Sequence, residues 1–211
     1  LRHQEQELIT KDATIREIHH RVKNNLQTVA SLLRIQARRT HSDEARDALT
    51  QAMRRVDAIA VVHDTLAQGL TQKVDFDEVF HRVLKLVAEV ASAPNTRART
   101  QSTGRFGVLP SEYATPLALA LTEVVTNAVE HGLAGQEGFV TIDAKRTEDN
   151  LRVTVRDTGL GLPEGRIGQG LGTQIIRTLI QGELGGTIEW HGSDGEGTEV
   201  VIDIPLRWLE R

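Results

Sequence analysis

The sequence predicts a helical hairpin that dimerises into a four-helix bundle, followed by an α+β two-layer sandwich. Apolar residues repeat every seven positions near the N-terminus, whereas later segments alternate apolar and polar residues as half-buried strands do. Charge also divides the chain: residues 1–71 carry 11 Lys and Arg against 9 Asp and Glu, and the remainder carries 14 against 20. We therefore expect two domains, at 1–71 and 75–211.

Residues 1 to about 39 predict one long amphipathic helix without an N-terminal cap. Because the pattern is already in register at Leu1, we expect the chain to be part of something longer. A stripe this narrow is buried only against partner helices. Its apolar residues fill two heptad positions, the first with Leu8, Ile15, Val22 and Val29 and the second with Ile18 and Leu32.

A second helix follows a tight connection at 40–42. Ser42 is the predicted N-cap, and Asp43 and Glu44 suit the positive end of the helix dipole. The helix repeats apolar residues over 45–66 in steps of four and three, and we interpret His63 within that stripe as a packed residue rather than a ligand. Two antiparallel helices cannot bury their stripes alone, so a homodimer is expected.

Two helices of the C-terminal part have recognisable starts. Asp75, with Glu78 three residues later, forms a capping-box pattern for a helix that runs to about 91. Thr115 and Pro116 open a second helix, which ends at Gly132. Helices beside consecutive antiparallel strands indicate an α+β sandwich rather than a βαβ fold. The other expected elements are a linker at 69–73, a strand or irregular edge segment at 98–106, strands at 138–146, 151–157, 186–191 and 198–204, a glycine-rich loop at 158–172 and a helix at 173–183.

Composition excludes several classes of function. Cysteine is absent, which removes disulfides and thiolate chemistry. We find neither an apolar run that could span a bilayer nor a signal peptide, and expect a cytoplasmic protein with no membrane segment. The net charge is −4, with four Phe, two Trp and one Tyr, so direct nucleic-acid binding is not expected.

Two adjacent histidines, His19 and His20, lie on the predicted first helix. With Ile15 at heptad position a, His20 falls at position f and points to solvent, whereas His19 at position e flanks the seam. An imidazole on a rigid helix, with Arg21 and Lys23 beside it, suits the acceptance of a phosphoryl group. By itself this segment also fits an ordinary basic surface helix.

Polar residues recur on the helix that ends at Gly132. Glu123, Asn127 and His131 are spaced four residues apart, so they line one face of the helix. The amide oxygen of Asn127 is a hard ligand that can join phosphate oxygens and waters around Mg²⁺. Any surface helix can show this spacing, so the pattern alone leaves both interpretations open.

Glycine-containing segments follow the strand that ends at Asp157. The sequence there is Asp-Thr-Gly-Leu-Gly-Leu-Pro, and a carboxylate at a strand end can accept a hydrogen bond from an exocyclic amine such as that of adenine. Residues 168–173 read Gly-Gln-Gly-Leu-Gly-Thr at a helix start, where backbone N–H groups favour phosphate. This run lacks the lysine of a P-loop and the preceding strand of a Rossmann turn. Each segment alone, including Gly197-Thr198, also fits a plain turn.

The order of these segments is more specific than any one of them. Asn-Ala-Val-Glu-His-Gly at 127–132, Asp-Thr-Gly-Leu-Gly-Leu-Pro at 157–163, Gly-Leu-Gly-Thr at 170–173 and Gly-Thr at 197–198 resemble the N, G1, G2 and terminal boxes of the Bergerat/GHKL ATP-binding fold. This resemblance covers most of 75–205. Upstream, His-His-Arg-Val-Lys-Asn-Asn-Leu-Gln at 19–27 resembles the phosphoacceptor segment of the HisKA_2 class of sensor histidine kinases, which is near the HWE group. The resemblance is to cytosolic members of this class from actinobacteria.

The resemblance implies the core of a two-component protein-histidine kinase that uses ATP and Mg²⁺. Such a core autophosphorylates a helix histidine and passes the phosphoryl group to an aspartate in the receiver domain of a response regulator, in this family often an RNA-binding antiterminator. His20 is the implied phosphoacceptor, and His19 is the less favoured candidate. Asn127 would hold Mg²⁺, and Asp157 would bind adenine. Glu123, counted among the catalytic residues, and His131 would contact the metal shell or the phosphates. The other implied nucleotide contacts are Gly159, Gly161, Gly170, Leu171, Gly172 and Thr198.

The chain departs from commoner histidine kinases because Arg21 rather than an acidic residue follows His20; Glu17 is the available substitute one turn earlier. It also has a short lid, and its sequence shows no clear aromatic box between the G1 and G2 boxes. Two other functions remain as alternatives. One is a catalytically decayed dimeric phosphotransfer or scaffold module, which the intact Asn127 and Asp157 disfavour. The other is a GHKL ATPase or serine kinase with Glu123 as its base, which leaves the histidine-bearing hairpin unexplained.

Overall fold

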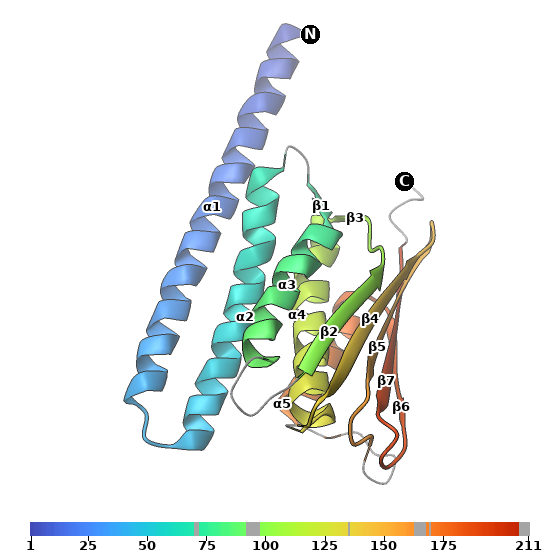
Figure 1. Cartoon of the computed structure of the whole chain (residues 1–211). Helices are drawn as coiled ribbons and strands as arrows, with labels where there is room; N and C mark the ends of the chain where they lie inside the picture. Colours follow the sequence, from blue (N-terminus) through green and yellow to red (C-terminus); the bar gives the residue numbers. More distant parts are fainter. Residues whose placement is uncertain (70–71, 92–97, 135, 163–167, 169, 207–211) are drawn as a thin grey trace. The chain divides into compact units, whose positions relative to one another are not determined.

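The computed structural model describes residues 1–69, 72–91, 98–134, 136–162, 168 and 170–206. The chain forms two compact units (Figure 1). The first comprises Leu1–Arg82 and Val108–Ala118, and the second comprises Val83–Gly107 and Leu119–Arg211. Two of these boundaries fall inside helices, so the units differ from the division expected near residues 71–75. The assignment of functional domains to 1–71 and 75–211 stays a prediction.

The first unit contains the predicted helical hairpin. Helices α1 (Arg2–Arg39) and α2 (Asp43–Gln68) have the lengths that the heptad pattern predicts. Ser42 caps α2, because its hydroxyl oxygen accepts a hydrogen bond from the Ala45 N–H at 3.3 Å. In the single chain, α1 buries Ala30 and leaves several large apolar side chains exposed: Leu8, Ile9, Ile18, Val29, Leu32 and Ile35.

This unit also contains two short strands that the sequence did not predict. Strand β1 (Lys73–Asp75) pairs antiparallel with β3 (Val108–Pro110). Strands of three residues are too short to display alternation, which explains why they were missed. Asp75 nevertheless stabilises the start of α3 (Phe76–Ala91), because its Oδ1 accepts a hydrogen bond from the Asp77 N–H at 3.1 Å.

Helix α4 (Ser111–Asn127) begins four residues before the predicted start. The prediction placed the start at Thr115 and Pro116 because proline favours a first helical turn, but Pro116 lies inside the helix. The earlier start is set by a tertiary contact, in which the Ser111 N–H donates to the Gln72 carbonyl oxygen at 2.9 Å.

The second unit contains a five-stranded sheet in the order β2-β4-β5-β7-β6. β2 pairs parallel with β4, and the remaining pairs are antiparallel. The segment at 98–106, expected as a strand or an irregular edge segment, contains the edge strand β2. A helical connection separates β2 from β4 in the chain, as parallel pairing requires. The strands are β2 (Ala98–Gly104), β4 (Gly138–Arg146), β5 (Asn150–Asp157), β6 (Thr187–Gly192) and β7 (Thr198–Pro205).

The two faces of this sheet differ in burial. Alternate side chains of β4, β5 and β7 are buried on the face that the helical segments of this unit cover (Figure 1): Val140, Ile142, Ala144, Leu151, Val153, Val155, Val200, Ile202 and Ile204. Full burial of each Val, Leu or Ile side chain contributes roughly 1.5–3 kcal/mol. These alternating positions form the core on which the loops of the unit are mounted.

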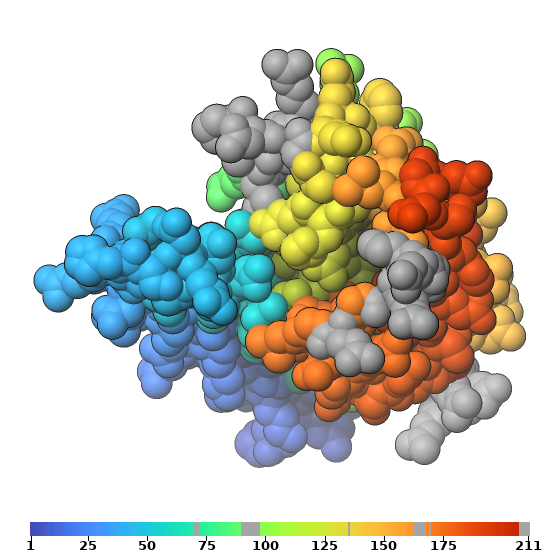
Figure 2. Space-filling view, turned by 90° about the horizontal axis from the view of Figure 1, so that it is seen from below, coloured from blue at the N-terminus to red at the C-terminus, as the bar shows by residue number. Residues whose placement is uncertain are grey.

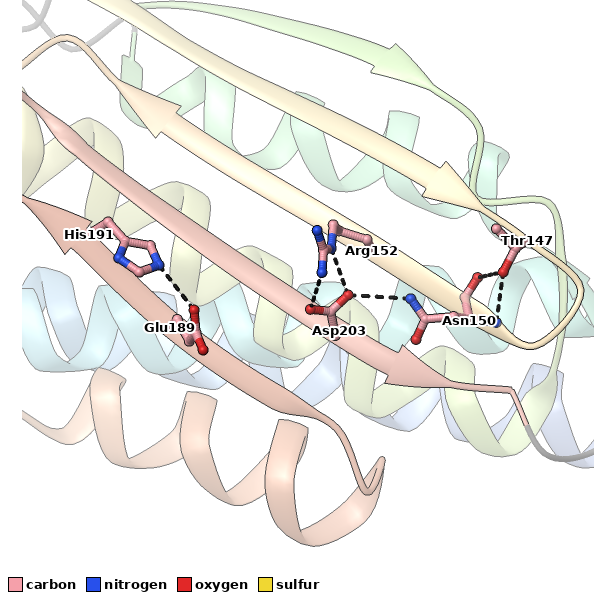
Figure 3. A network of polar contacts seen from close by, with 6 residues as sticks. All are labelled: Thr147, Asn150, Arg152, Glu189, His191 and Asp203. Carbon is pink, nitrogen blue, oxygen red and sulfur yellow. Dashed lines mark hydrogen bonds and ion pairs between the residues drawn. The ribbon is translucent and has the colours of Figure 1, made fainter.

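The opposite face carries cross-strand polar pairs (Figure 3). Arg152 of β5 opposes Asp203 of β7 in register and binds its carboxylate through two hydrogen bonds, of 2.8 and 3.0 Å. Asn150 donates to the same carboxylate at 3.3 Å. On the edge strand β6, His191 lies 3.1 Å from Glu189. Hydrogen bonding by Arg152 holds the pKa of Asp203 below its usual value.

Helical segments of the second unit end in wide turns. α4 continues into a π-helical turn, η1 (Ala128–Gly132), which confirms a helix end at Gly132. The helix predicted at 173–183 is α5 (Leu171–Arg177) followed by a second π-helical turn, η3 (Thr178–Glu183). Within the described residues, none of the helices is both long and apolar enough to cross a membrane.

Candidate functional site

The two adjacent histidines of α1 lie in different environments. His20 is exposed, whereas His19 is half-buried and its Nδ1 lies 2.9 Å from the Nδ1 of His63 on α2. The two ring centroids are 5.1 Å apart, with the planes tilted by 40°. The expected orientations, with His20 outward and His19 at the seam, are confirmed for the single chain. Which histidine accepts a phosphoryl group stays a prediction.

Burial lowers the pKa of His19 below 6.5, and it lowers the pKa of His63 with a further contribution from the neighbouring His19. Both rings therefore resist protonation as pH falls. The heptad pattern predicted His63 as a packed residue, but it did not predict His19 as the partner of His63. A signal was present, because His19 and His63 are each 22 residues from His41 in the connection, and an antiparallel hairpin pairs such positions.

Beside His63, Asp64 joins three helices. Its Oδ1 lies 3.1 Å from Lys23 Nζ of α1, and its Oδ2 lies 2.8 Å from Arg82 Nη1 of α3. Burial opposes ionisation of Asp64, but the hydrogen bonds from Lys23 and Arg82 outweigh it and hold the pKa of this carboxyl below its usual value. Neither Asp64 nor Arg82 was singled out from the sequence.

Glu17 was the expected acidic neighbour of the acceptor histidine. Its Oε1 lies 3.2 Å from the Arg21 Nε one turn later, in an exposed pair. The structure thus places Glu17 against Arg21, and a role of Glu17 at the imidazole of His20 stays a prediction.

In the second unit, Asp157 is a buried carboxylate at the end of β5, 8% exposed. Its Oδ1 accepts a hydrogen bond from the Gly159 N–H at 3.0 Å, and the backbone of Thr198, opposite it on β7, donates a second. Burial raises the pKa of Asp157 despite these hydrogen bonds. A buried carboxylate gains from each further hydrogen-bond donor, so an amine-bearing ligand suits this position.

Close backbone approach holds the segment after Asp157 in place. A β-carbon on Gly159 would overlap the carbonyl oxygen of Gly132, which also accepts a hydrogen bond from the Leu160 N–H at 2.8 Å. Gly161 has φ of +78°, and a β-carbon there would overlap the carbonyl oxygen of Ser193. Both positions therefore require glycine.

These contacts bring three segments that are distant in sequence to one face of the unit. Figure 2 shows η1 in yellow, the segment after β5 in orange and the β6–β7 turn in red on the same side. Gly132 at the end of η1 also adjoins Asp157, because a β-carbon on Gly132 would lie 2.6 Å from Asp157 Oδ2. This region thus combines a buried carboxylate with closely packed turns.

Glu123 and Asn127 of α4 meet the first turn of α5. A β-carbon on Gly172 would lie 3.0 Å from Glu123 Oε2 and 3.7 Å from both terminal amide atoms of Asn127. His131, the third residue of the predicted row, is exposed on η1. The π-helical turn interrupts the four-residue spacing of the row after Asn127. Glu123 and Asn127 therefore lie near Gly172, whereas His131 does not join them there.

Thr126, next to Asn127, was missed by the sequence analysis. Its side chain is buried, and its Oγ1 has no hydrogen-bond partner within the described part of the chain. A buried hydroxyl of this kind is stabilised when a ligand or water supplies a partner. No sequence signal distinguishes it from other helix threonines.

The remaining predicted contacts lie at the ends of elements. Gly170 is the N-cap of α5, Leu171 is its exposed first residue, and Thr198 opens β7 opposite Asp157. Residues 163–167 and 169 of the predicted glycine-rich loop lie outside the described residues. Among the described residues, no three His, Asp or Glu side chains form a complete metal site. Mg²⁺ does not require one, because it usually takes one or two protein ligands together with phosphates and waters.

Models of two known families match this chain. Residues 17–91 match the family model HisKA_2, "Histidine kinase", and residues 112–207 match HATPase_c, "Histidine kinase-, DNA gyrase B-, and HSP90-like ATPase". Over 94% of its length the chain is 50% identical to sensor histidine kinase PdtaS of Mycobacterium tuberculosis, covering 40% of that protein. It is 31% identical to blue-light-activated histidine kinase 2 of Erythrobacter litoralis, over 92% of the chain and 58% of the relative.

A solved structure extends the similarity to the fold. The histidine kinase domain from the Erythrobacter litoralis EL346 blue-light activated histidine kinase superposes with a TM-score of 0.68 at 28% identity. The match covers 97% of this chain and 96% of that one. The chain thus spans about two fifths of PdtaS but nearly the whole of this kinase domain.

Proposed function

Because this chain belongs to the sensor histidine kinases with a HisKA_2 and a HATPase_c domain, we propose that it phosphorylates its own His20 from ATP and then a response regulator. The observation that carries the proposal is the contrast between the two adjacent histidines. His20 is exposed and accessible, whereas His19 is engaged with His63. In a chain of this family, the exposed imidazole of His20 is favoured as acceptor over the imidazole of His19, which is hydrogen-bonded to His63.

The second unit fits a bound nucleotide with Mg²⁺. The buried Asp157 would accept a hydrogen bond from the adenine amine, and the tight backbone at Gly159 and Gly161 would border the base. Asn127 would supply the amide oxygen for Mg²⁺, with Glu123 beside it. Gly170, Leu171, Gly172, His131 and Thr198 are the remaining proposed contacts, as the family resemblance implies.

Chemically, the nucleotide supplies a γ-phosphoryl group whose bond to the bridging oxygen breaks, so that ADP leaves with that electron pair. A neutral ring nitrogen of His20 forms the new N–P bond, and the ring N–H proton passes to water. In the second transfer the N–P bond breaks and a carboxylate oxygen of the regulator forms an O–P bond. Positioning and charge neutralisation, rather than covalent help from other side chains, dominate such transfers.

We further propose that the chain acts as a homodimer in the cytoplasm. The exposed apolar residues along α1, such as Leu8, Ile18 and Leu32, suit a second copy of the hairpin in a four-helix bundle. The partner that receives the phosphoryl group would be a receiver domain, in the suspected subfamily one joined to an RNA-binding antiterminator. We propose no direct contact with nucleic acid.

The test is incubation of the chain with γ-labelled ATP and Mg²⁺, followed by mass-spectrometric placement of the phosphate. We expect an acid-labile label on His20 that His20→Gln abolishes and His19→Gln retains at His20. Label that persists in His20→Gln and disappears in His19→Gln would reverse the choice of acceptor.

The same experiment separates the alternatives. Failure of the chain to bind ATP with Mg²⁺ would support a decayed scaffold module. ATP hydrolysis without any phosphohistidine, or phosphate on a partner's serine, would support a GHKL ATPase or serine kinase with Glu123 as base.

A further inference from the structure

The hydrogen bond between His19 and His63 restricts how α1 can rotate. It joins the Nδ1 atoms of two half-buried rings on opposite helices of the hairpin, at 2.9 Å. Successive residues of an α-helix are separated by about 100° around its axis, since 3.6 residues complete a turn. A contact that holds the direction of His19 therefore also holds the direction of its neighbour His20.

The bond can form only in particular proton arrangements. One Nδ1 must carry a proton and donate, and the other must present its lone pair and accept. The accepting ring is then neutral, with its proton on Nε2. A packing contact between two apolar side chains requires no particular proton arrangement. The histidine pair therefore restricts the relative placement of its two side chains more than the apolar contacts around it do.

Burial favours the neutral form of the pair. Lys23 from α1 and Arg82 from α3 both bind Asp64, the residue that follows His63. This cluster of ion pairs lies next to His63 along α2. Burial lowers the pKa of both histidines in the same sense.

We propose that His63, through its hydrogen bond to His19, is a positioning residue that sets the outward direction of the phosphoacceptor His20. The inference rests on the proposed function, because it concerns the acceptor of that reaction. His63 does not touch the transferred group in this proposal; it acts through His19 and the rotation of α1. The apolar heptad stripe already turns this face of α1 outward; the hydrogen bond between His19 and His63 adds a directional contact that holds the rotation more narrowly.

The experiment compares two substitutions at His63 in the full chain. His63→Leu removes the hydrogen bond, whereas His63→Asn keeps an amide atom near the place of Nδ1 and can restore it. The matched control is His41→Asn, which changes an exposed histidine in the connection between α1 and α2. Rates of phosphohistidine formation are measured over a range of ATP concentrations, and melting curves confirm that each variant is folded.

We expect His63→Leu to lower kcat about tenfold with KM for ATP unchanged, and His63→Asn to recover most of that loss, since misplacement of a reacting group reduces rate more than substrate binding. His41→Asn should match the unsubstituted chain. Nitrogen-15 NMR of the histidine rings should also show a scalar coupling between the two Nδ1 nuclei across the hydrogen bond, which His63→Asn removes.

Three results would overturn the inference: an unchanged kcat in His63→Leu, equal losses in the Leu and Asn variants, or absence of the Nδ1–Nδ1 coupling. The NMR measurement keeps the proposal testable if His63→Leu does not fold. A failure of the proposed function looks different, since the unsubstituted chain would then form no phosphohistidine while the coupling persists. That result removes the reaction for which His20 is positioned, and the inference with it.

Discussion

Gly159 lies against the backbone of Gly132, so closely that a β-carbon on Gly159 would overlap the Gly132 carbonyl oxygen. The two residues are 27 positions apart in sequence and belong to different proposed nucleotide-binding segments. Their contact joins the end of the α4 helical segment to the turn after Asp157. The proposed nucleotide site is therefore sensitive to a single methyl group at this point.

Gly159→Ala should weaken both folding and nucleotide binding. The methyl group must displace the Gly132 backbone, and such overpacking costs typically about 1–3 kcal/mol. Urea denaturation measures the stability, and titration with an ATP analogue measures the binding. The control is Gly182→Ala, where a β-carbon would have no neighbour within 4 Å and the residue lies in a helical segment. A Gly159→Ala variant as stable as the control would contradict the close contact.

Asp157→Asn should separate stability from binding. The pKa of Asp157 is raised in the folded chain, so the wild type loses stability as pH rises from the unfolded value of 3.8 through the folded one. At pH 7 the ionised carboxylate therefore costs stability that the neutral amide does not. We expect the variant to be at least as stable as the wild type at pH 7 while binding ATP about 10- to 100-fold more weakly, since it loses a charged hydrogen-bond acceptor.

Asp203→Asn is the matched control for Asp157→Asn. The pKa of Asp203 is lowered by Arg152, so its contribution is present above the unfolded value of 3.8 and is lost as pH falls through the folded one. The substitution at Asp203 should slightly destabilise the chain at pH 7 and leave nucleotide binding unchanged. Denaturation curves at several pH values distinguish the two signs, and identical behaviour of the two variants would refute the assignment.

Lys23→Met should destabilise the hairpin more than Arg21→Met. Lys23 and Asp64 are only 22% and 16% exposed, whereas Arg21 and Glu17 are 76% and 60% exposed. Exposed pairs contribute about 0.2–1 kcal/mol, whereas hydrogen bonds to charged groups in less accessible places contribute about 1.5–3 kcal/mol. Thermal or urea unfolding of both variants tests the order. Equal losses would show that Asp64 does not depend on Lys23.

Stability should depend on pH through the histidine pair. Both folded pKa values lie below 6.5, so the unfolded chain binds protons more readily, and stability falls as pH drops below about 6.5 towards the folded values. The nearby charged groups are Lys23 and Arg82, which pair with Asp64 next to His63 in sequence, and Asp64 stays ionised in this range because its pKa is lowered. Replacing both histidines by glutamine should flatten this part of the stability curve, measured between pH 5 and 7. A curve of unchanged slope would exclude the pair as its origin.

Much of the fold followed from periodic patterns. The heptad repeat predicted α1 and α2 nearly to the residue, and alternation predicted β4, β5, β6 and β7. These elements bury one stripe or one face over many residues, so each position adds to the same signal. The short strands β1 and β3 have no such length, and the start of α4 depends on a hydrogen bond between Ser111 and Gln72.

For the candidate site, the residue types and their order in the chain indicated Asn127, Asp157 and the glycines, because those segments resemble a known family. The π-helical turn after Asn127 could not be predicted, since it depends on how the helix end fits against Asp157 and the turn at Gly159. It leaves His131 exposed, outside the group formed at Gly172. Thr126, by contrast, is recognised only through its burial.

By itself the sequence determined the helical hairpin, the strands of the sheet, the family and the outward direction of His20, because each depends on patterns that are local or repeated along the chain. Only the tertiary structure decided the partners: His63 for His19, Lys23 and Arg82 for Asp64, and Gly132 for Gly159. Such pairs join residues far apart in sequence, and their formation depends on the register and close approach of whole elements, which no local pattern specifies.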